Sequence, residues 1–113
     1  MNKKRLGGYV YVLHFTDKLS HAQHYIGFSQ APLTRIARHK AGYTTTRIIQ
    51  ACHDNGIGLV KANIIPVPHR IFERRLKAYR KASTFCKYCS PKTYKKSTQA
   101  FLLREVKKYE ERR

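Results

Sequence analysis

Three segments of the chain combine β-branched and aromatic residues in a way that is typical of strands. They are Tyr9 to Phe15 (YVYVLHF), the short stretch Tyr25 to Phe28, and Leu59 to Ile65. The residues between the first two segments, Thr16 to Gln23, are polar and predict a hairpin loop. We therefore expect a hairpin near the start of the chain and a third strand in its middle.

Apolar residues at helical spacing mark four further segments. The first begins near Pro32, carries Leu33, Ile36 and Ala37 on one side, and ends at Gly42. The other three run from Thr46 to His53, from His69 to Ala82 and from Thr98 to Arg113. The predicted order of elements is β-β-α-α-β-α-α.

A chain of 113 residues has room for one compact domain. We expect a single domain over residues 1–113, with the last helix following a core of about residues 9–89. No stretch approaches the roughly 20 apolar residues of a membrane-spanning helix. The chain begins with basic residues, as a signal peptide does, but the apolar run behind them breaks at His14 and Asp17, so no signal peptide is expected.

The net charge points to the class of partner. Lysine and arginine number 24 against 6 acidic residues, which gives a formal charge of +18. Such a surplus repels itself unless a polyanion balances it, and nucleic acid is the polyanion that we expect. An anionic membrane surface is the alternative, but the sequence has no lipidation motif and no basic amphipathic helix with a broad apolar face.

The three cysteines are an odd number, which speaks against a disulfide framework and for a reducing cytoplasm. Cys86 and Cys89, in a predicted loop from Ser83 to Ser97, form half of a zinc site. A complete site needs two more ligands, for which Cys52 and His53 are candidates if the fold brings them near. We expect reduced thiols in preference to structural zinc. Four other histidines are interpreted as surface or strand residues: His14, His21, His24 and His69.

The small number of carboxylates narrows the search for a metal site. A two-metal nuclease needs several carboxylates around its ions, and here the only adjacent pair lies at the end of the chain. Asp17 and Asp54 lie in predicted turns, where aspartate commonly bonds to the backbone. Glu73 is therefore the best candidate for a single metal-binding carboxylate. The alternative, which local sequence alone favours, is an ion pair with Lys77 one helical turn on.

Four other residues are candidates for binding a phosphate group or for catalysis at it. Arg35 and His39 are four apart on the first predicted helix, so they project from one face beside its apolar stripe. Arginine suits a phosphate oxygen, and histidine can move a proton near neutral pH. Tyr11 and Tyr25 lie on the two hairpin strands, where a hydroxyl can position a water. The simpler alternatives are a solvated basic face for the helical pair and ordinary packing for the tyrosines.

In combination, these residues resemble the GIY-YIG nuclease superfamily. The second half of that name is literal at Tyr25-Ile26-Gly27, whereas the first half reads Tyr9-Val10-Tyr11 and keeps its final tyrosine. Arg35, His39 and the helical Glu73 follow in order, and the resemblance covers about residues 9–89.

The resemblance implies an α+β fold, with a small antiparallel three-stranded sheet flanked by helices. It also implies a metal-dependent endonuclease that hydrolyses phosphodiester bonds by a single-metal mechanism, in DNA more than in RNA. Glu73 would hold one Mg²⁺ or Mn²⁺ and Arg35 would neutralise the phosphoryl oxygens. Tyr11 would orient or deprotonate the attacking water, helped by Tyr25 or His39. Since a free tyrosine has a pKa of about 10, we expect neighbouring positive charge to assist it.

Two other classes of function compete with a nuclease. A binding module would keep the fold and the basic surface without cutting, and a ribosomal-type or RNA-packaging protein would need the charge alone. The complete set of five residues favours catalysis. No second DNA-binding module is recognisable, so we expect specificity to come from nucleic-acid structure, from a partner or from a homodimer.

Overall fold

The structure is a computed structural model that describes residues 7–111. The ends of the predicted domain, residues 1–6 and 112–113, lie outside the described residues, as does most of the basic start that we compared with a signal peptide. The elements are β1 (Gly8–Leu19), β2 (Ala22–Ser29), α1 (Pro32–Ala41), α2 (Arg47–Asp54), β3 (Leu59–Val67), α3 (Ile71–Ala78), the 3₁₀-helix η1 (Ala82–Phe85) and α4 (Tyr94–Glu111). The α+β fold with a three-stranded antiparallel sheet is confirmed, and apart from η1 the elements follow the predicted order.

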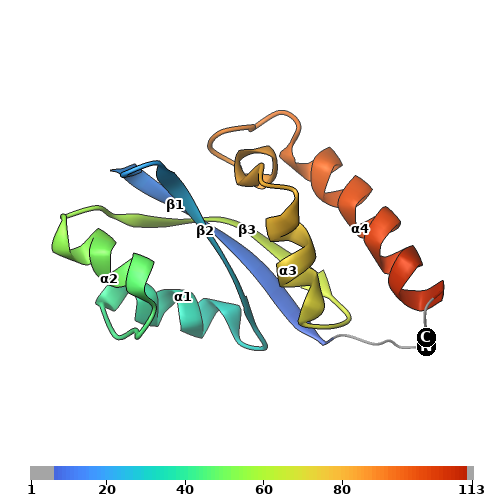
Figure 1. Ribbon diagram of the computed structural model, residues 1–113, viewed down its shortest axis with the longest axis horizontal. Helices are drawn as coiled ribbons and strands as arrows, with labels where there is room; N and C mark the ends of the chain where they lie inside the picture. The colour runs from blue at the N-terminus through green and yellow to red at the C-terminus, as the bar shows by residue number, and fades with distance from the viewer. Residues whose placement is uncertain (1–6, 112–113) are drawn as a thin grey trace.

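The central strand of the sheet is β1, because the strand order is β2-β1-β3 (Figure 1). It pairs antiparallel with both neighbours, so that Tyr11 lies opposite Gly27 of β2 and Ile64 of β3. The middle of β1 is therefore paired with a neighbouring strand on each side.

The hairpin loop predicted from Thr16 to Gln23 is wrong, because both strands continue through most of it. β1 reaches Leu19 and β2 begins at Ala22, with a tight turn in which Ser20 has a φ of 57°. The side chains of residues 16–18 are exposed. Of this end of the hairpin only Leu19 and Ala22 pack against an apolar core, so its strand geometry leaves no apolar alternation in the sequence.

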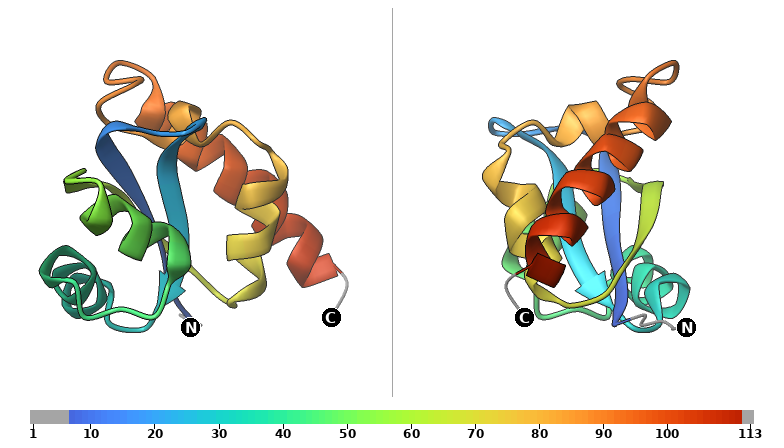
Figure 2. Two further views of the ribbon diagram at one scale, coloured as in Figure 1. Left: turned by 60° about the vertical axis from the view of Figure 1, so that its left-hand side comes forward. Right: turned by 90° about the vertical axis from the view of Figure 1, so that its right-hand side faces the viewer.

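Helices cover both faces of the sheet (Figures 1 and 2). Side chains alternate along a strand. On β1, Tyr11, Leu13 and Phe15 therefore belong to the core cluster under α1 and α2, whereas Val10 and Val12 belong to the cluster under α3, η1 and α4. Each face of the sheet has its own apolar core, and the central strand contributes a row of buried side chains to each.

The predicted apolar stripe of α1 is confirmed at Ile36 and wrong at Leu33 and Ala37. Leu33 is 64% exposed and Ala37 is exposed too, whereas the buried residues of the helix are Pro32, Ile36 and His39. The end of the helix at Gly42 agrees with the prediction, since Gly42 has a φ of 88° and caps the last turn. The helix thus turns a histidine toward the sheet in place of an alanine or leucine.

The later helices begin and end at other residues than predicted. α3 ends at Ala78 and not at Ala82, because Arg80 adopts a φ of 57° that no helix can continue through, and η1 follows. α4 begins at Tyr94, before the predicted Thr98. The cysteine-bearing loop is correspondingly shorter than predicted.

A buried carboxylate joins α3 to α4. Glu105 is 7% exposed, accepts a hydrogen bond from the Tyr79 hydroxyl at 3.0 Å, and lies 3.7 Å from Arg75 and 3.8 Å from Lys108. Buried carboxylates are stable only when they are paired in this way. Glu105 therefore holds together two helices that both carry excess positive charge.

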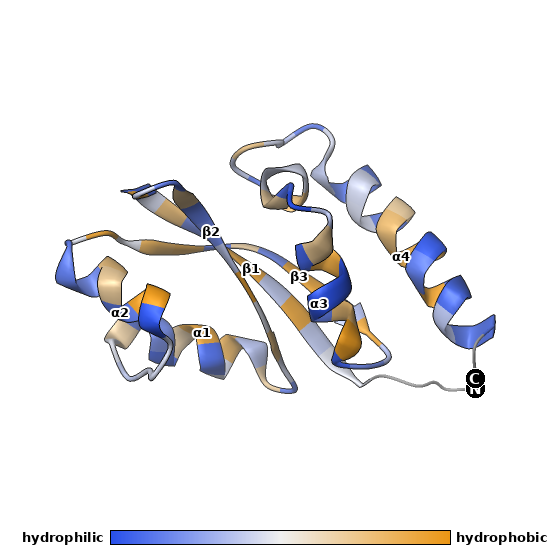
Figure 3. Cartoon of the chain, in the orientation of Figure 1, coloured by the Kyte–Doolittle hydropathy of each residue, from blue (hydrophilic) through white to orange (hydrophobic). Residues whose placement is uncertain are grey.

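The distribution of hydropathy matches this layered arrangement. Apolar residues lie along the strands and recur in the helices, whereas α4 is largely hydrophilic (Figure 3). Within residues 7–111, no helix is long and apolar enough to cross a membrane.

The close approach of Tyr11 to β2 requires glycine at position 27. A side-chain carbon added to Gly27 would fall on the phenol ring and hydroxyl of Tyr11, its partner across the sheet. We therefore expect Gly27→Ala to lower the free energy of unfolding by about 1–3 kcal/mol, the usual cost of overpacking.

Denaturant unfolding of a double-mutant cycle with Tyr11→Ala tests this cause directly. Once the ring is gone, the extra methyl group at position 27 should cost much less. An equal cost in both backgrounds would show that the Tyr11 ring is not what Gly27 accommodates.

Candidate active site at the edge of the sheet

The structure gathers the five predicted site residues around the β2 edge of the sheet. Tyr11 comes from β1, Tyr25 from β2, Arg35 and His39 from α1, and Glu73 from α3. The rings of Tyr11, Tyr25 and His39 form a triangle whose centroids are 5.7–6.1 Å apart. Arg35 and Glu73 both lie close enough to act on the ionisation of Tyr11.

A buried hydrogen bond joins Tyr11 to His39. The Tyr11 hydroxyl lies 2.9 Å from Nε2 of His39, and the two residues are 1% and 2% exposed. Nδ1 of His39 lies 3.1 Å from the Thr44 hydroxyl, which also accepts the backbone N–H of Thr46. All these contacts are satisfied when His39 carries its proton on Nδ1 and accepts the Tyr11 proton at Nε2.

The pKa of Tyr11 is raised well above the usual range of a tyrosine. Burial is the largest cause, and the neighbouring Tyr25 raises the pKa further. Arg35 lowers it and Glu73 raises it by smaller amounts. The expectation that surrounding positive charge would make this phenol easier to ionise is therefore wrong, because desolvation of the phenolate outweighs the attraction of one exposed arginine.

The pKa of His39 is shifted in the opposite direction. Burial lowers it below the usual value of a histidine, and the positive charge of Arg35 lowers it further. His39 is consequently neutral near pH 7. A neutral imidazole whose Nε2 faces the Tyr11 hydroxyl is arranged to accept a proton from it.

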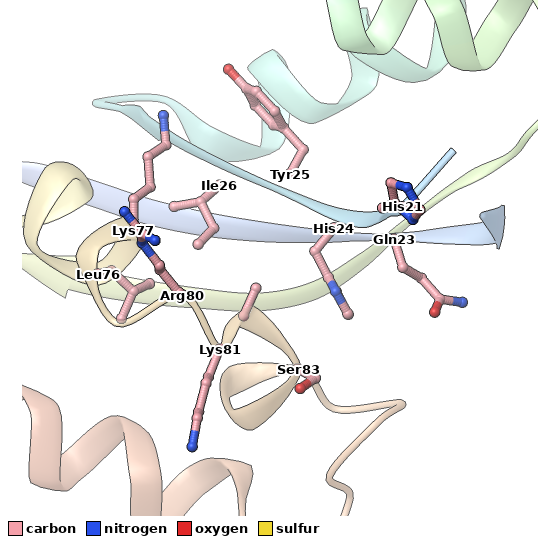
Figure 4. A pocket seen from close by; sticks show the side chains of 11 residues that line it. His21, Gln23, His24, Tyr25, Ile26, Leu76, Lys77, Arg80, Lys81 and Ser83 are labelled. Carbon is pink, nitrogen blue, oxygen red and sulfur yellow. The ribbon is translucent and has the colours of Figure 1, made fainter. Parts of the chain in front are cut away.

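Glu73 lies in the ion pair that local sequence favours, and that pair lies beside the tyrosines. Its carboxylate is 3.0 Å from Nζ of Lys77, and Nζ is 5.9 Å from the centre of the Tyr25 ring. Figure 4 shows the Tyr25 ring and the end of Lys77 on the same side of β2. The Glu73 side chain keeps 24% of its surface exposed and is therefore accessible to a solute cation.

Only one carboxylate is near enough to this site to bind a divalent ion there. All six acidic residues lie in the described part of the chain, and the buried Glu105 is occupied between α3 and α4. Asp17 accepts a hydrogen bond from the next backbone N–H in the exposed hairpin. Glu73 is the only carboxylate that acts on Tyr11. A single oxygen ligand suits Mg²⁺, which keeps most of its waters.

Two basic hollows border Tyr25, Arg35 and His39, whereas Glu73 lines another hollow with Arg70, Arg74 and Lys77. The first, of about 490 Å³, lies between β2 and α3 and is lined by Lys77, Arg80 and Lys81 among others (Figure 4). A second, of about 390 Å³, lies against His39 and is lined by Arg35 and Arg38. No acidic side chain lines either hollow.

A second polar cluster lies away from these five residues. His14 and His24 face Cys86 and Cys89, and their ligand atoms all lie within 4.8 Å of one another, so the group could hold a metal ion. The interpretation of His14 and His24 as ordinary strand residues is therefore incomplete. Cys52 is buried in the core cluster under α1 and α2 and is not part of the group. The missing signal was the strand register, which places His14 directly opposite His24.

Comparison of the chain with protein-family models, with curated proteins and with solved structures gives no match. Its function is therefore inferred from the geometry of the site and from the charge around it.

The buried pair predicts how His39 titrates. Nitrogen-detected NMR should show a neutral ring protonated on Nδ1 that titrates below the ordinary histidine value of about 6.5. Because the pKa is lowered on folding, the unfolded chain binds more protons below that value, so this histidine makes the protein less stable as the pH falls. In Tyr11→Phe the tautomer preference should weaken while the pKa stays low, since burial and Arg35 persist. Titration at or above the ordinary value would contradict the burial of His39, and a ring protonated on Nε2 would contradict the assigned hydrogen bond.

Proposed function

We propose that this protein is a metal-dependent endonuclease of the GIY-YIG type, which hydrolyses phosphodiester bonds in nucleic acid and acts on DNA more than on RNA. The observation that supports the proposal most is the buried Tyr11–His39 hydrogen bond with Arg35 and Glu73 beside it. Packing alone gives no reason for four chemically different polar groups to meet at one sheet edge.

In this mechanism the proton leaves Tyr11 by way of His39. As a water molecule gives its proton to the Tyr11 oxygen, the Tyr11 hydroxyl proton passes to Nε2 of His39. The concerted transfer avoids a free phenolate, which the raised pKa of Tyr11 makes costly. The hydroxide forms a bond to phosphorus, the bond to the 3′ oxygen breaks, and that oxygen takes a proton from solvent.

The charged residues act on the phosphate. Arg35 neutralises charge on the phosphoryl oxygens, where a guanidinium can donate two hydrogen bonds. Glu73 would hold Mg²⁺ or Mn²⁺, and the ion would polarise the phosphoryl group and stabilise the leaving oxygen. Lys77 must release the carboxylate or share it, and its flexible, partly exposed chain allows this.

The basic hollows account for binding. Lys77, Arg80 and Lys81 line the hollow that Tyr25 borders, and Arg35 and Arg38 line the hollow that His39 borders. A phosphate backbone that crosses the β2 edge would be held on both sides of the scissile bond. Contacts of this kind read no base identity, so weak sequence preference follows.

One observation favours a second candidate function, a basic nucleic-acid-binding module that does not cut. The Glu73 carboxylate already has a cationic partner in Lys77 at 3.0 Å. If that pair is permanent, the site holds no divalent ion and the fold serves binding alone.

Glu73→Gln separates the two candidates, with Glu110→Gln on the exposed end of α4 as the control. For a nuclease, Mg²⁺-dependent cleavage should fall by at least about two to three orders of magnitude, because loss of the ion removes several kcal/mol of transition-state stabilisation. Nucleic-acid binding should stay equal or become slightly tighter, since a negative charge is lost. The control should cut at the wild-type rate.

For a plain ion pair, Glu73→Gln should cost only about 0.2–0.5 kcal/mol of stability. A variant that still cleaves in a metal-dependent way would remove Glu73 from the mechanism. A wild-type protein that cuts neither plasmid, linear, single-stranded nor branched DNA with Mg²⁺ or Mn²⁺ would favour the binding module.

Binding should depend steeply on salt in either case. Each phosphate contact on duplex DNA contributes about −0.9 to the slope of log affinity against log salt concentration, so about six contacts lower the affinity roughly a thousandfold between 50 and 200 mM salt. Fluorescence anisotropy over a salt series measures this slope. A slope equivalent to one or two contacts would contradict an extended basic footprint.

A further inference from the structure

Four potential metal ligands from distant parts of the chain meet at the turn end of the hairpin. His14 of β1 and His24 of β2 are partners across the sheet, and Cys86 and Cys89 lie in the loop between η1 and α4. Nδ1 of His14 lies 3.3 Å from Nε2 of His24, 3.4 Å from Sγ of Cys86 and 3.7 Å from Sγ of Cys89. Sγ of Cys89 lies 3.4 Å from Nε2 of His24.

Hydrogen bonds do not explain this convergence. An imidazole nitrogen has either one proton or one lone pair in the ring plane, so Nδ1 of His14 can make one good hydrogen bond. Here it has three neighbours at contact distance. Thiols are weak partners that would not draw two histidines together. A cation at the centre would satisfy all four atoms at once.

The spacing of the atoms fits a tetrahedral zinc ion. With about 2.3 Å from zinc to sulfur and about 2.0–2.1 Å to nitrogen, tetrahedral geometry places two nitrogens about 3.3 Å apart and a nitrogen and a sulfur about 3.5 Å apart. The nitrogen pair is 3.3 Å apart, and three of the four nitrogen–sulfur distances are 3.4, 3.7 and 3.4 Å. Four of the six distances among these atoms therefore match a zinc-sized tetrahedron, and all four atoms lie within 4.8 Å of one another.

We propose that His14, His24, Cys86 and Cys89 form a structural Cys₂His₂ zinc site. Two thiolates and two imidazoles suit zinc, whereas Mg²⁺ prefers oxygen. All four positions are filled by the protein, which is the pattern of structural sites and leaves none for a substrate. The zinc site is separate from Glu73, and it holds whether or not the protein is a nuclease.

The zinc ion would fasten a loop that few apolar contacts hold. Lys87, Tyr88 and Cys89 are exposed, whereas Cys86 is fully buried beside the core around Phe85. The loop leads from η1, which follows α3, to the start of α4. Coordination from both hairpin strands would therefore fix the helical layer that contains Glu73 against the sheet.

Metal analysis of the purified full-length chain tests the zinc site without any substrate. The protein should contain about one zinc per chain, and replacement by Co²⁺ should give the strong visible absorption of a tetrahedral thiolate complex. Cys89→Ser and His24→Asn should abolish stoichiometric zinc and the cobalt spectrum. Because Cys89 is exposed, its replacement leaves the core intact, and circular dichroism checks that the variant folds.

Matched controls keep the result specific. Cys52→Ala and His21→Asn change a cysteine and a histidine outside the cluster and should keep zinc, as should Glu73→Gln. Removal of zinc by a chelator should lower the melting temperature of the wild type but not that of Cys89→Ser.

Several outcomes would overturn the site. The first is wild-type protein that holds no zinc after equilibration with zinc and dialysis. The second is Cys89→Ser protein that holds as much zinc as the wild type. The third is a denatured, unreduced chain with one free thiol, which would show that Cys86 and Cys89 form a disulfide and not a metal site.

Discussion

The hydrogen bond between Tyr11 and His39 lies between the central strand and α1, and both side chains are almost completely buried. Removing one partner would leave a buried polar group unsatisfied at a cost of about 1–3 kcal/mol, so the pair constrains everything around it. It sets the rotation of α1, requires glycine at position 27 for the ring to fit, and recruits Thr44 to hold the second imidazole nitrogen. The same burial raises the pKa of Tyr11 and lowers the pKa of His39, so that a phenol that is hard to ionise lies beside a neutral imidazole.

The rest of the molecule is dominated by unbalanced positive charge. With six acidic residues for 24 basic ones, each carboxylate matters, and the structure uses two of them where helices carry many cations. Glu105 neutralises the contact of α3 with α4, and Glu73 pairs with Lys77 at the sheet edge. The hollows on either side of that edge keep their positive charge. A bound polyanion would relieve this repulsion and stabilise the fold as it binds.

The sequence predicts the parts of this architecture that local patterns encode. The β-branched segments became strands, and Gly42 ends α1 as expected. The burial of His39 was not predictable, because the rotation of α1 depends on a partner 28 residues away. The pairing of His14 with His24 was hidden for a related reason. A hairpin interpreted as two short strands and a long loop has no defined register. The two histidines are aligned by the tight turn at Ser20 together with a register shift between His14 and Leu19, which the sequence does not reveal.

The β3 edge of the sheet is built in a way that disfavours pairing between copies of the chain. β3 is an edge strand, and it contains Pro66, which has no N–H to donate and is tolerated in a strand where that group would face outward. The exposed Lys61 on the same strand adds a charge. Both features discourage another chain from adding a strand there. Copies crowded along one polyanion would thus be kept from merging into a continuous sheet and aggregating.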